Sequence, residues 1–317
     1  MTKYIMRRLL ISIPIFFGVT VMVFVLINMA PGDPLVALMN PNEEVGINRD
    51  LVRQQLGLDK PMPYRYLVWV SQMLRGNLGY SYITSQPVAR MIFDRLPLTL
   101  ELTGIALILG VTIGVILGIV SALRQNTAVD YVVGTLGLIW IAIPGFVFAM
   151  GFLYIFAVRL DLLPAMGVTS LGKPFALSDH LKHLAMPVIA LALTELAGFL
   201  RYTRSSMVEV LRSDYLTVAR AKGLRERVII VRHALRNALI PVVTIIGFSI
   251  PGLFGGSVLI EQIFGWPGIG QLYLKAINQR DYPLVMGLVL FSAGLVLISN
   301  LVVDILYTFL DPRISYD

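Results

Sequence analysis

The chain alternates between long uncharged runs and shorter charged segments. Leu9–Gly32 contains no charged residue and follows the basic residues Lys3, Arg7 and Arg8. Five further apolar segments lie at about residues 98–123, 131–158, 185–203, 238–260 and 284–308. Each has about the length that an α-helix needs to cross a hydrocarbon core of ~30 Å. The pattern predicts an all-α integral membrane protein with six transmembrane helices.

Residues 1–30 form the first of these predicted helices. A basic start followed by an apolar run is also typical of a signal peptide, whose apolar region has about 7–15 residues. The run here is longer, and no A-x-A-like cleavage site follows it. We therefore expect a retained transmembrane helix with a cytoplasmic N-terminus.

The distribution of charge predicts how the helices are oriented. Residues 201–237, between the fourth and fifth spans, hold nine Lys or Arg and three acidic residues, whereas residues 259–283 hold two of each sign. Because basic residues collect in cytoplasmic loops, segment 201–237 is predicted to be cytoplasmic, as are the N-terminus and the tail at 309–317. The same rule explains the net charge of +7 without a nucleic-acid partner.

Residues 31–94 then lie outside the membrane, ahead of a transmembrane core at 95–308. This segment mixes charges, prolines and aromatics. It is predicted to be a small ordered extracytoplasmic subdomain with an amphipathic helix near Tyr64–Leu74. Two roles stay open for it: covering the ends of the helices, or receiving a partner protein that delivers substrate.

Small residues mark one face of the second span. Gly110, Gly114 and Gly118 are spaced four apart. Without side chains there, a neighbouring helix can approach closely, which favours helix association in lipid. The stripe predicts close packing but does not identify the neighbour.

Helix-breaking pairs occur in the third and fifth spans, at Pro144–Gly145, Pro251–Gly252 and Gly255–Gly256. Such breaks persist in a membrane only where protein or water satisfies the freed carbonyls. They are candidates for a translocation pathway or gate, although kinked helices that only pack have the same pattern.

Three acidic residues fall within the predicted spans. Glu101 begins the second span, and Asp304 lies near the cytoplasmic end of the sixth. Glu195 is deeper, about 9 Å along the helix from Arg201. Its roles are lining a polar pathway, relaying protons, or pairing with a basic residue, and we favour the pairing.

A nucleotide site is not expected on this chain. "GVTSLGKP", Gly167 to Pro174, is nearly a phosphate-binding loop. Its last position is proline, which offers neither a hydroxyl for Mg²⁺ nor a backbone N–H for phosphate, and no strand precedes it.

Metal and thiol chemistry are not expected either. His180 and His183 are spaced like two ligands beside Asp179, but no third ligand follows at a known spacing, so we assign no metal site. The chain has no cysteine, which excludes disulfides and thiol catalysis. The sequence therefore predicts a non-catalytic protein that binds no cofactor itself.

The segment "DYLTVARAKGLRERVIIVRHALRNALIP", Asp214 to Pro241, predicts a helical elbow at the inner membrane surface. Ser213 or Asp214 is a plausible N-cap for a helix over Tyr215–Lys222, and Gly223 is suited to end it in a left-handed turn. A second helix begins near Arg225 and continues into the fifth span. A loop needing only positive charge would not require a glycine stop, so we interpret the elbow as a docking element.

At this elbow the sequence resembles the permease subunits of ABC importers of the type I fold, in their oligopeptide/dipeptide branch. The coupling loop of that family reads E-A-A-x-x-x-G with I-x-L-P about nine residues later, and the branch typically reads "DYxxTARAKG". The leading Glu is absent here, as is usual in the branch. The matching coupling positions are Asp214, Tyr215, Ala219, Arg220, Ala221, Lys222, Gly223, His233, Asn237 and Pro241.

The resemblance runs along essentially the whole chain. Its further landmarks are "MAPGDP", "GNLGYS", "RLPLTLELT", "LPAMG", "RYTRSSMVEVL", "EQIFGWPGIG", "RDYP" and "DPR". It implies a bacterial or archaeal plasma-membrane importer in which this chain pairs with a second homologous permease. Two cytosolic ATPases with ATP and Mg²⁺ would dock on the elbows, and an external solute-binding protein would deliver a peptide. The pathway would be lined by the second to sixth spans, with the first helix peripheral.

Other functions stay open beside peptide import. A nickel chelate or glutathione is an alternative cargo. A proton-coupled carrier using Glu195 and Asp304 is an alternative mechanism, and a receptor or assembly subunit that transports nothing is a third possibility.

Overall fold

The structure, a computed structural model, describes residues 2–29, 59–255 and 257–310. Within these ranges the regular elements are helices, and β-structure is confined to one isolated bridge between Tyr80 and Pro87. Predicted features at residues 30–58, at Gly256 and at residues 311–317 lie outside the described residues. The all-α fold class is confirmed for the described part of the chain.

Four helices are long and apolar enough to cross a membrane: α1 (Thr2–Met29), α4 (Val88–Leu123), α7 (Leu177–Leu211) and α14 (Tyr282–Leu310). Two further pairs of shorter helices pass the same test together but are bent at a break. The described part therefore has four continuous spans, or six if each bent pair counts as one.

The first bent pair replaces the single third span that the sequence predicts at 131–158. Helix α5 (Ala128–Ala142) ends before Pro144, and α6 (Gly145–Phe152) starts at an angle of 96° to it. Helix α6 continues as the π-helix η2 (Leu153–Arg159). Proline lacks the backbone N–H that would continue α5, so the chain turns at this position.

The second bent pair, Glu226–Ala238 with Ile240–Gly255, begins in the second half of the elbow. Helix α8 (Asp214–Ala221) is followed by α9 (Glu226–Val228), the π-helix η3 (Ile229–Ala234) and α10 (Leu235–Ala238). Helix α11 (Ile240–Gly255) then leaves at 41°. Pro251 lies inside α11 and does not end it, whereas Gly255 is its last residue.

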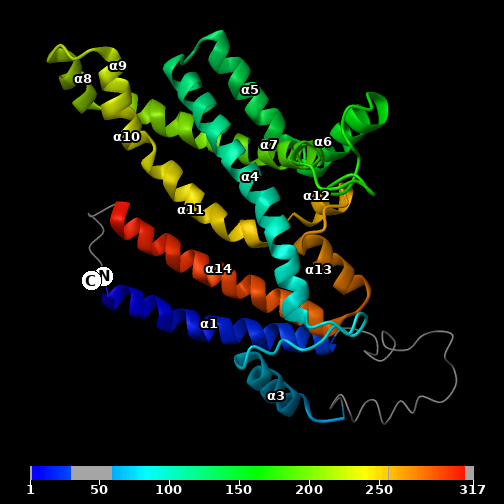
Figure 1. Ribbon diagram of the computed structural model, residues 1–317. Helices are drawn as coiled ribbons and strands as arrows, with labels where there is room; N and C mark the ends of the chain where they lie inside the picture. The colour runs from blue at the N-terminus through cyan, green and yellow to red at the C-terminus, as the bar shows by residue number, and fades with distance from the viewer. Residues whose placement is uncertain (1, 30–58, 256, 311–317) are drawn as a thin grey trace.

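Helices α4 and α7 cross at the centre of the molecule, and the glycine stripe lies in the crossing (Figure 1). A Cβ atom at Gly110 would lie 2.7 Å from Cβ of Glu195, and one at Gly114 would lie 2.8 Å from the Leu196 carbonyl oxygen. A Cβ at Gly118 would lie 2.7 Å from Cβ of Thr203. The helix that packs against the glycine stripe, which the sequence did not identify, is therefore α7.

Helix α1 lies beside α14 at the edge of the molecule, and α3 (Met62–Leu74) packs below them (Figure 1). Phe24 contacts the rings of Tyr66 and Trp69 on α3, and the Thr20 and Tyr66 hydroxyls are 2.8 Å apart. The amphipathic helix predicted near Tyr64–Leu74 is thus present and is anchored on α1.

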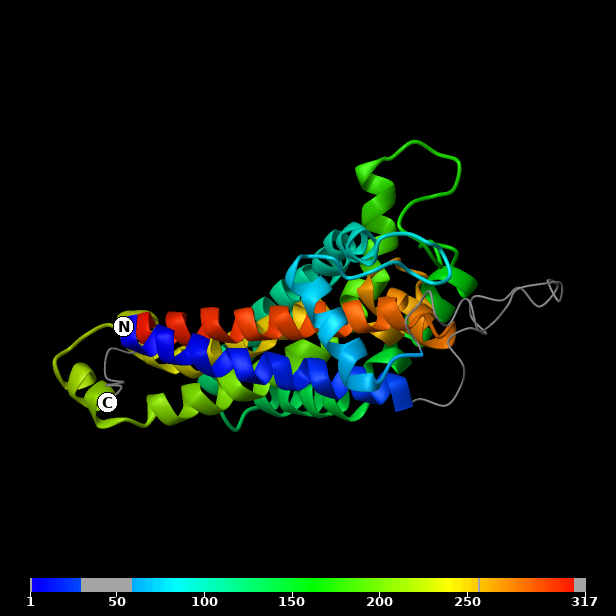
Figure 2. The same cartoon turned by 90° about the horizontal axis from the view of Figure 1, so that it is seen from below.

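The two ends of the helix bundle carry different elements. The start of α1, the end of α14 and the elbow share one end (Figure 2). The other end carries α12 (Val258–Ile263) and α13 (Ile269–Asn278). Helix α4 also reaches further toward this second end than expected, because it begins at Val88, inside the segment 31–94.

Candidate functional site

The turn that ends α8 is a Schellman motif. Gly223 has φ +76°, and its N–H donates to the Arg220 carbonyl at 2.9 Å. The next N–H, of Leu224, donates to the Ala219 carbonyl at 3.4 Å. These two bonds satisfy carbonyls that the end of a helix leaves unpaired. A Cβ on Gly223 would meet no atom within 4 Å, so the need for glycine comes from the backbone angle and not from space.

The expected capping of α8 by a side chain is not found. Ser213 occupies the N-cap position, but its hydroxyl donates backward to the Val210 carbonyl and makes no cap bond. Asp214, in the first turn, carries its negative charge near the positive end of the helix dipole.

The inner face of the elbow is a small apolar core. Leu216 and Ala219 of α8 are buried against Ile229 and Ala234 of η3. The cluster also contains Ala122 of α4, Met207 of α7 and Ala238 of α10. Of the two alanines among the family-matched positions, Ala219 therefore faces inward and Ala221 is exposed.

Three of the family-matched residues brace this core. Asn237 donates from Nδ2 to the Tyr215 hydroxyl at 2.8 Å, and that hydroxyl donates to the His233 carbonyl at 3.5 Å. These bonds tie α8 to η3 and α10. Pro241 lies at the second position of α11, where a missing N–H breaks no helical hydrogen bond.

The outer face of the elbow is mostly positive. Arg220 pairs with Glu226, with Nη2 3.0 Å from Oε1, and both side chains are about half exposed. Asp214 is exposed as well. The remaining exposed charges on this face are basic: Lys222, Arg225, Arg227, Arg232 and Arg236.

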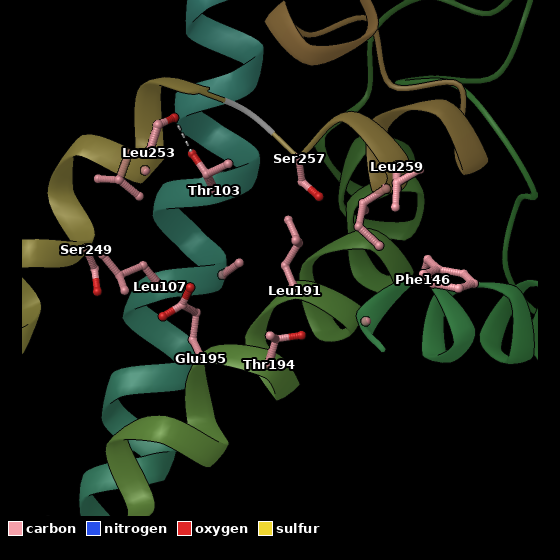
Figure 3. A pocket seen from close by; sticks show the side chains of 14 residues that line it. Thr103, Leu107, Phe146, Leu191, Thr194, Glu195, Ser249, Leu253, Ser257 and Leu259 are labelled. Atoms are coloured by element: carbon pink, nitrogen blue, oxygen red, sulfur yellow. Dashed lines mark hydrogen bonds between the residues drawn. The ribbon is translucent and has the colours of Figure 1, made fainter. Parts of the chain in front are cut away.

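A cavity of about 330 Å³ opens among α4, α6, α7 and α11 (Figure 3). Of the predicted pathway residues, it brings together Glu195, Gly145 and Gly252. Pro144, Pro251 and Gly255 adjoin it in the chain without lining it. The described residues that line it are Thr103, Ala106, Leu107, Gly145, Phe146, Leu191, Thr194, Glu195, Ser249, Gly252, Leu253, Ser257, Leu259 and Ile260.

The pairing expected for Glu195 is not observed. Its carboxylate forms no ion pair with any described Lys, Arg or His, although Arg201 follows it on the same helix. The basic residue of α7 that does form an ion pair is Arg204, one turn further toward the elbow. Glu195 instead faces the cavity.

Two family models together match nearly the whole chain. A model described as "Binding-protein-dependent transport system inner membrane component" matches residues 114–316, and a model for the N-terminal part of such components matches residues 1–103. The chain belongs to this family of ABC-importer permeases.

Curated relatives extend over the full permease. The oligopeptide transport system permease protein AppB of Bacillus subtilis is 42% identical over 317 residues, covering all of both chains. The dipeptide transport system permease protein DppB of Alkalihalophilus pseudofirmus is 39% identical, again over all of both chains. The glutathione transport system permease protein GsiC of Escherichia coli O6:H1 is 38% identical over 100% of each.

A solved structure supports the fold alone. The inward-facing MetNI methionine ABC transporter matches with a TM-score of 0.56 at 15% identity, covering 72% of this chain and 100% of that chain.

A buried ion pair near the elbow was missed by reasoning from the sequence. Arg204 of α7 binds Asp130 of α5 through two bonds, Nε to Oδ1 at 2.7 Å and Nη2 to Oδ2 at 2.8 Å. Asp130 also accepts bonds from the Ser121 hydroxyl and the Asn126 N–H. The sequence did offer a signal for this pair, because Asp130 and Arg204 each lie near the predicted cytoplasmic end of a span. The pair fixes α5, the end of α4 and α7 to one another.

The permease landmark "EQIFGWPGIG" also has a structural explanation. Glu261 is fully buried, and its carboxylate accepts bonds from the Gln271 N–H at 2.8 Å and the Thr99 hydroxyl at 3.3 Å. The Trp266 indole donates to the Leu98 carbonyl at 2.9 Å. The motif therefore caps α13 and fastens it to α4. Burial raises the pKa of Glu261 to about 7.

His180 and His183, considered above as metal ligands, contact different partners. His180 Nε2 lies 2.7 Å from Glu101 Oε1, and its Nδ1 lies 3.0 Å from the Val168 carbonyl. His183 Nδ1 lies 2.9 Å from the Asp179 carbonyl. Among the residues that the structure describes, no group of three or more His, Cys, Asp or Glu is arranged to hold a metal ion.

Proposed function

We propose that this permease moves oligopeptides or dipeptides into the cell, driven by ATPase subunits that dock on the elbow. The observation that carries the proposal is the elbow itself. It is a braced helical projection whose inner core joins α4 and α7 and whose outer face is basic. Such a surface complements an acidic groove on a cytosolic partner.

The proposed complex holds a second homologous permease, two cytosolic ATPases that bind ATP and Mg²⁺, and an external solute-binding protein. This chain supplies the membrane pathway and performs no hydrolysis. The elbow end of the bundle, with the start of α1 and the end of α14, faces the cytoplasm, in agreement with the positive charge there.

The peptide substrate is supported by relatives named for oligopeptide and dipeptide transport that align over the full chain. The relative named for glutathione transport favours glutathione, itself a modified tripeptide, as a second candidate cargo. Competition between labelled glutathione and short peptides for uptake distinguishes the two.

Gly223 provides the test of the elbow. Gly223→Val places a β-branched residue at φ +76° and is expected to unwind the Schellman turn, at about 1–2 kcal/mol or more. ATP-dependent peptide uptake by the reconstituted complex should then fall severalfold while the permease still assembles in the membrane. Uptake and co-purification with the ATPase are measured together.

Gly223→Asn is the matched control, because asparagine tolerates the left-handed region better than other residues with a side chain. It should retain most of the uptake. Normal transport by an assembled Gly223→Val complex would reject the elbow as the coupling element.

A further inference from the structure

Among the described residues that line the cavity, Glu195 contributes the one charged side chain. It is half-buried in the middle of α7, within a candidate membrane span. A carboxylate in this environment is unfavourable unless a cation or hydrogen-bond donors neutralise it. No described residue of the chain supplies that cation, and the cavity is the side from which a counter-ion can reach Glu195.

The base of the Glu195 side chain is held firmly against α4. A Cβ on Gly110 would approach Cβ of Glu195 to 2.7 Å, which shows how closely the two backbones pass. Figure 3 shows the carboxylate beside Leu107, with Thr194 from the same helix and Ser249 from α11 also on the wall. The close crossing thus fixes where the charge is presented.

Two of the hydroxyl groups on the wall, those of Thr103 and Ser249, act as acceptors toward the cavity. Thr103 donates its proton to the carbonyls of Thr99 at 2.7 Å and Leu253 at 3.0 Å. Ser249 donates to the Ile245 carbonyl at 3.1 Å. Because each hydroxyl has one proton, these oxygens offer only lone pairs to a ligand. An ammonium group, with three N–H donors and a positive charge, complements this set.

The lining does not suit the carboxylate end of a peptide. Its described residues include no Lys, Arg or His to pair with a ligand carboxylate, and Glu195 would repel one. A volume of about 330 Å³ is near the lower end for small-molecule sites, so the cavity takes the end of a peptide and not a long chain.

We propose that the cavity is a binding subsite for a cationic amine of the cargo, with Glu195 as the specificity residue. The amine is either the free α-amino group of a peptide or a basic side chain, which share the same chemistry. The proposal rests on the proposed function as a peptide importer and names the part of the cargo that this chain recognises inside the membrane.

The test uses proteoliposomes that contain the complete importer with its binding protein and ATPases. Uptake is measured for three peptides: trialanine, N-acetyl-trialanine, and N-acetyl-Lys-Ala-Ala. Glu195→Gln removes the charge with little change of shape. Glu209→Gln on the same helix is the control, because Glu209 is exposed and lies outside the cavity. ATP hydrolysis is recorded in parallel.

Glu195→Gln is expected to lower trialanine uptake about tenfold, the loss of one charge-assisted contact, and to leave the low uptake of N-acetyl-trialanine unchanged. Glu209→Gln should change neither. If uptake of N-acetyl-Lys-Ala-Ala also falls, the subsite accepts any amine; if it does not, the subsite is specific for the α-amino group.

If Glu195→Gln lowers the uptake of trialanine and of N-acetyl-trialanine equally, the subsite proposal is overturned. Glu195 would then have a structural role or a role in proton transfer. Measuring uptake with a protonophore distinguishes these two roles. Unchanged trialanine uptake would overturn the subsite proposal too. A wild-type complex that hydrolyses ATP but accumulates none of the peptides overturns the proposed function instead, and with it the ligand named here.

Discussion

At Gly268 and Gly270 the backbone makes room for a carboxylate. A Cβ on Gly268 would lie 2.5 Å from Cδ of Glu261, and one on Gly270 would lie 3.0 Å from its Oε2. The two glycines of the "GIG" sequence are therefore required by the buried acid that caps the following helix. Their role is visible only when Glu261 is placed beside them.

The raised pKa of Glu261 makes a pH dependence testable. Because the folded-state pKa lies above the ordinary value of 4.5, the contribution to stability is fully present below about pH 4.5 and is lost as the pH rises to about 7. A shift of this size corresponds to about 3 kcal/mol. The Tm of the wild-type permease in detergent should fall from about pH 5 to about pH 8.

Glu261→Gln removes the titrating group but keeps an oxygen that accepts the Gln271 N–H. Its Tm should vary less over the same pH range. An equally steep wild-type and variant profile would show that another group controls the pH response.

Single residues were predictable where a local pattern demanded them. Gly223 was assigned to a left-handed turn from its place after a basic helix, and the structure gives it a positive φ. Contacts between distant residues were not: Ser81 donates to Asp281, 200 positions further along the chain. Only the folded chain brings the "GNLGYS" and "RDYP" segments together.

Among the helices, the crossing of α4 and α7 depends on the absence of side chains. Gly114→Ala places a methyl group 2.8 Å from the Leu196 carbonyl oxygen, a rigid backbone atom. The two helices must separate, which should destabilise the permease by about 1–3 kcal/mol. Thermal unfolding of the purified protein and its yield in the membrane measure the effect.

Gly104→Ala on the same helix is the matched control, since its Cβ would meet no atom within 4 Å. The control should keep or slightly raise the stability, because alanine favours helix more than glycine. Equal destabilisation by both changes would mean that helix propensity and not the crossing is responsible.

The existence of the helices followed from hydropathy, but their ends did not. Helix α4 begins at Val88, well before the uncharged run, because Val88 and Ile92 are buried against α13 and α14. Arg90 and Asp94 point away, highly exposed and 3.7 Å apart. A search for uncharged segments stops at such residues, although an amphipathic turn continues through them.

On the scale of the whole molecule, the orientation in the membrane can be tested directly because the chain has no cysteine. Leu171, in the loop after η2, is fully exposed, and Lys222 is exposed on the elbow. Leu171→Cys should react with a membrane-impermeant thiol reagent in intact cells. Lys222→Cys should react only after the membrane is permeabilised, and the reverse pattern would invert the proposed topology.

The sequence predicted the class of molecule, which depends on composition. Its assignment of the basic segment to the cytoplasmic side stays a prediction that rests on charge. It did not predict the right-angle turn between α5 and α6, because a proline in a span signals a break without its angle. It also did not predict that Glu195 forms no ion pair with the described residues, which depends on how α7 is rotated.

The Asp130 and Arg204 pair has a mechanical consequence. Together with the glycine crossing, it fastens α4, α5 and α7 beside the elbow, so we expect these three helices to move as one stiff unit. Bending is then expected at the breaks around Pro144 and Leu239. If the elbow is the ATPase dock proposed above, a push on it reaches the walls of the cavity as a change in the angles at those breaks, and not as a loosening of the bundle.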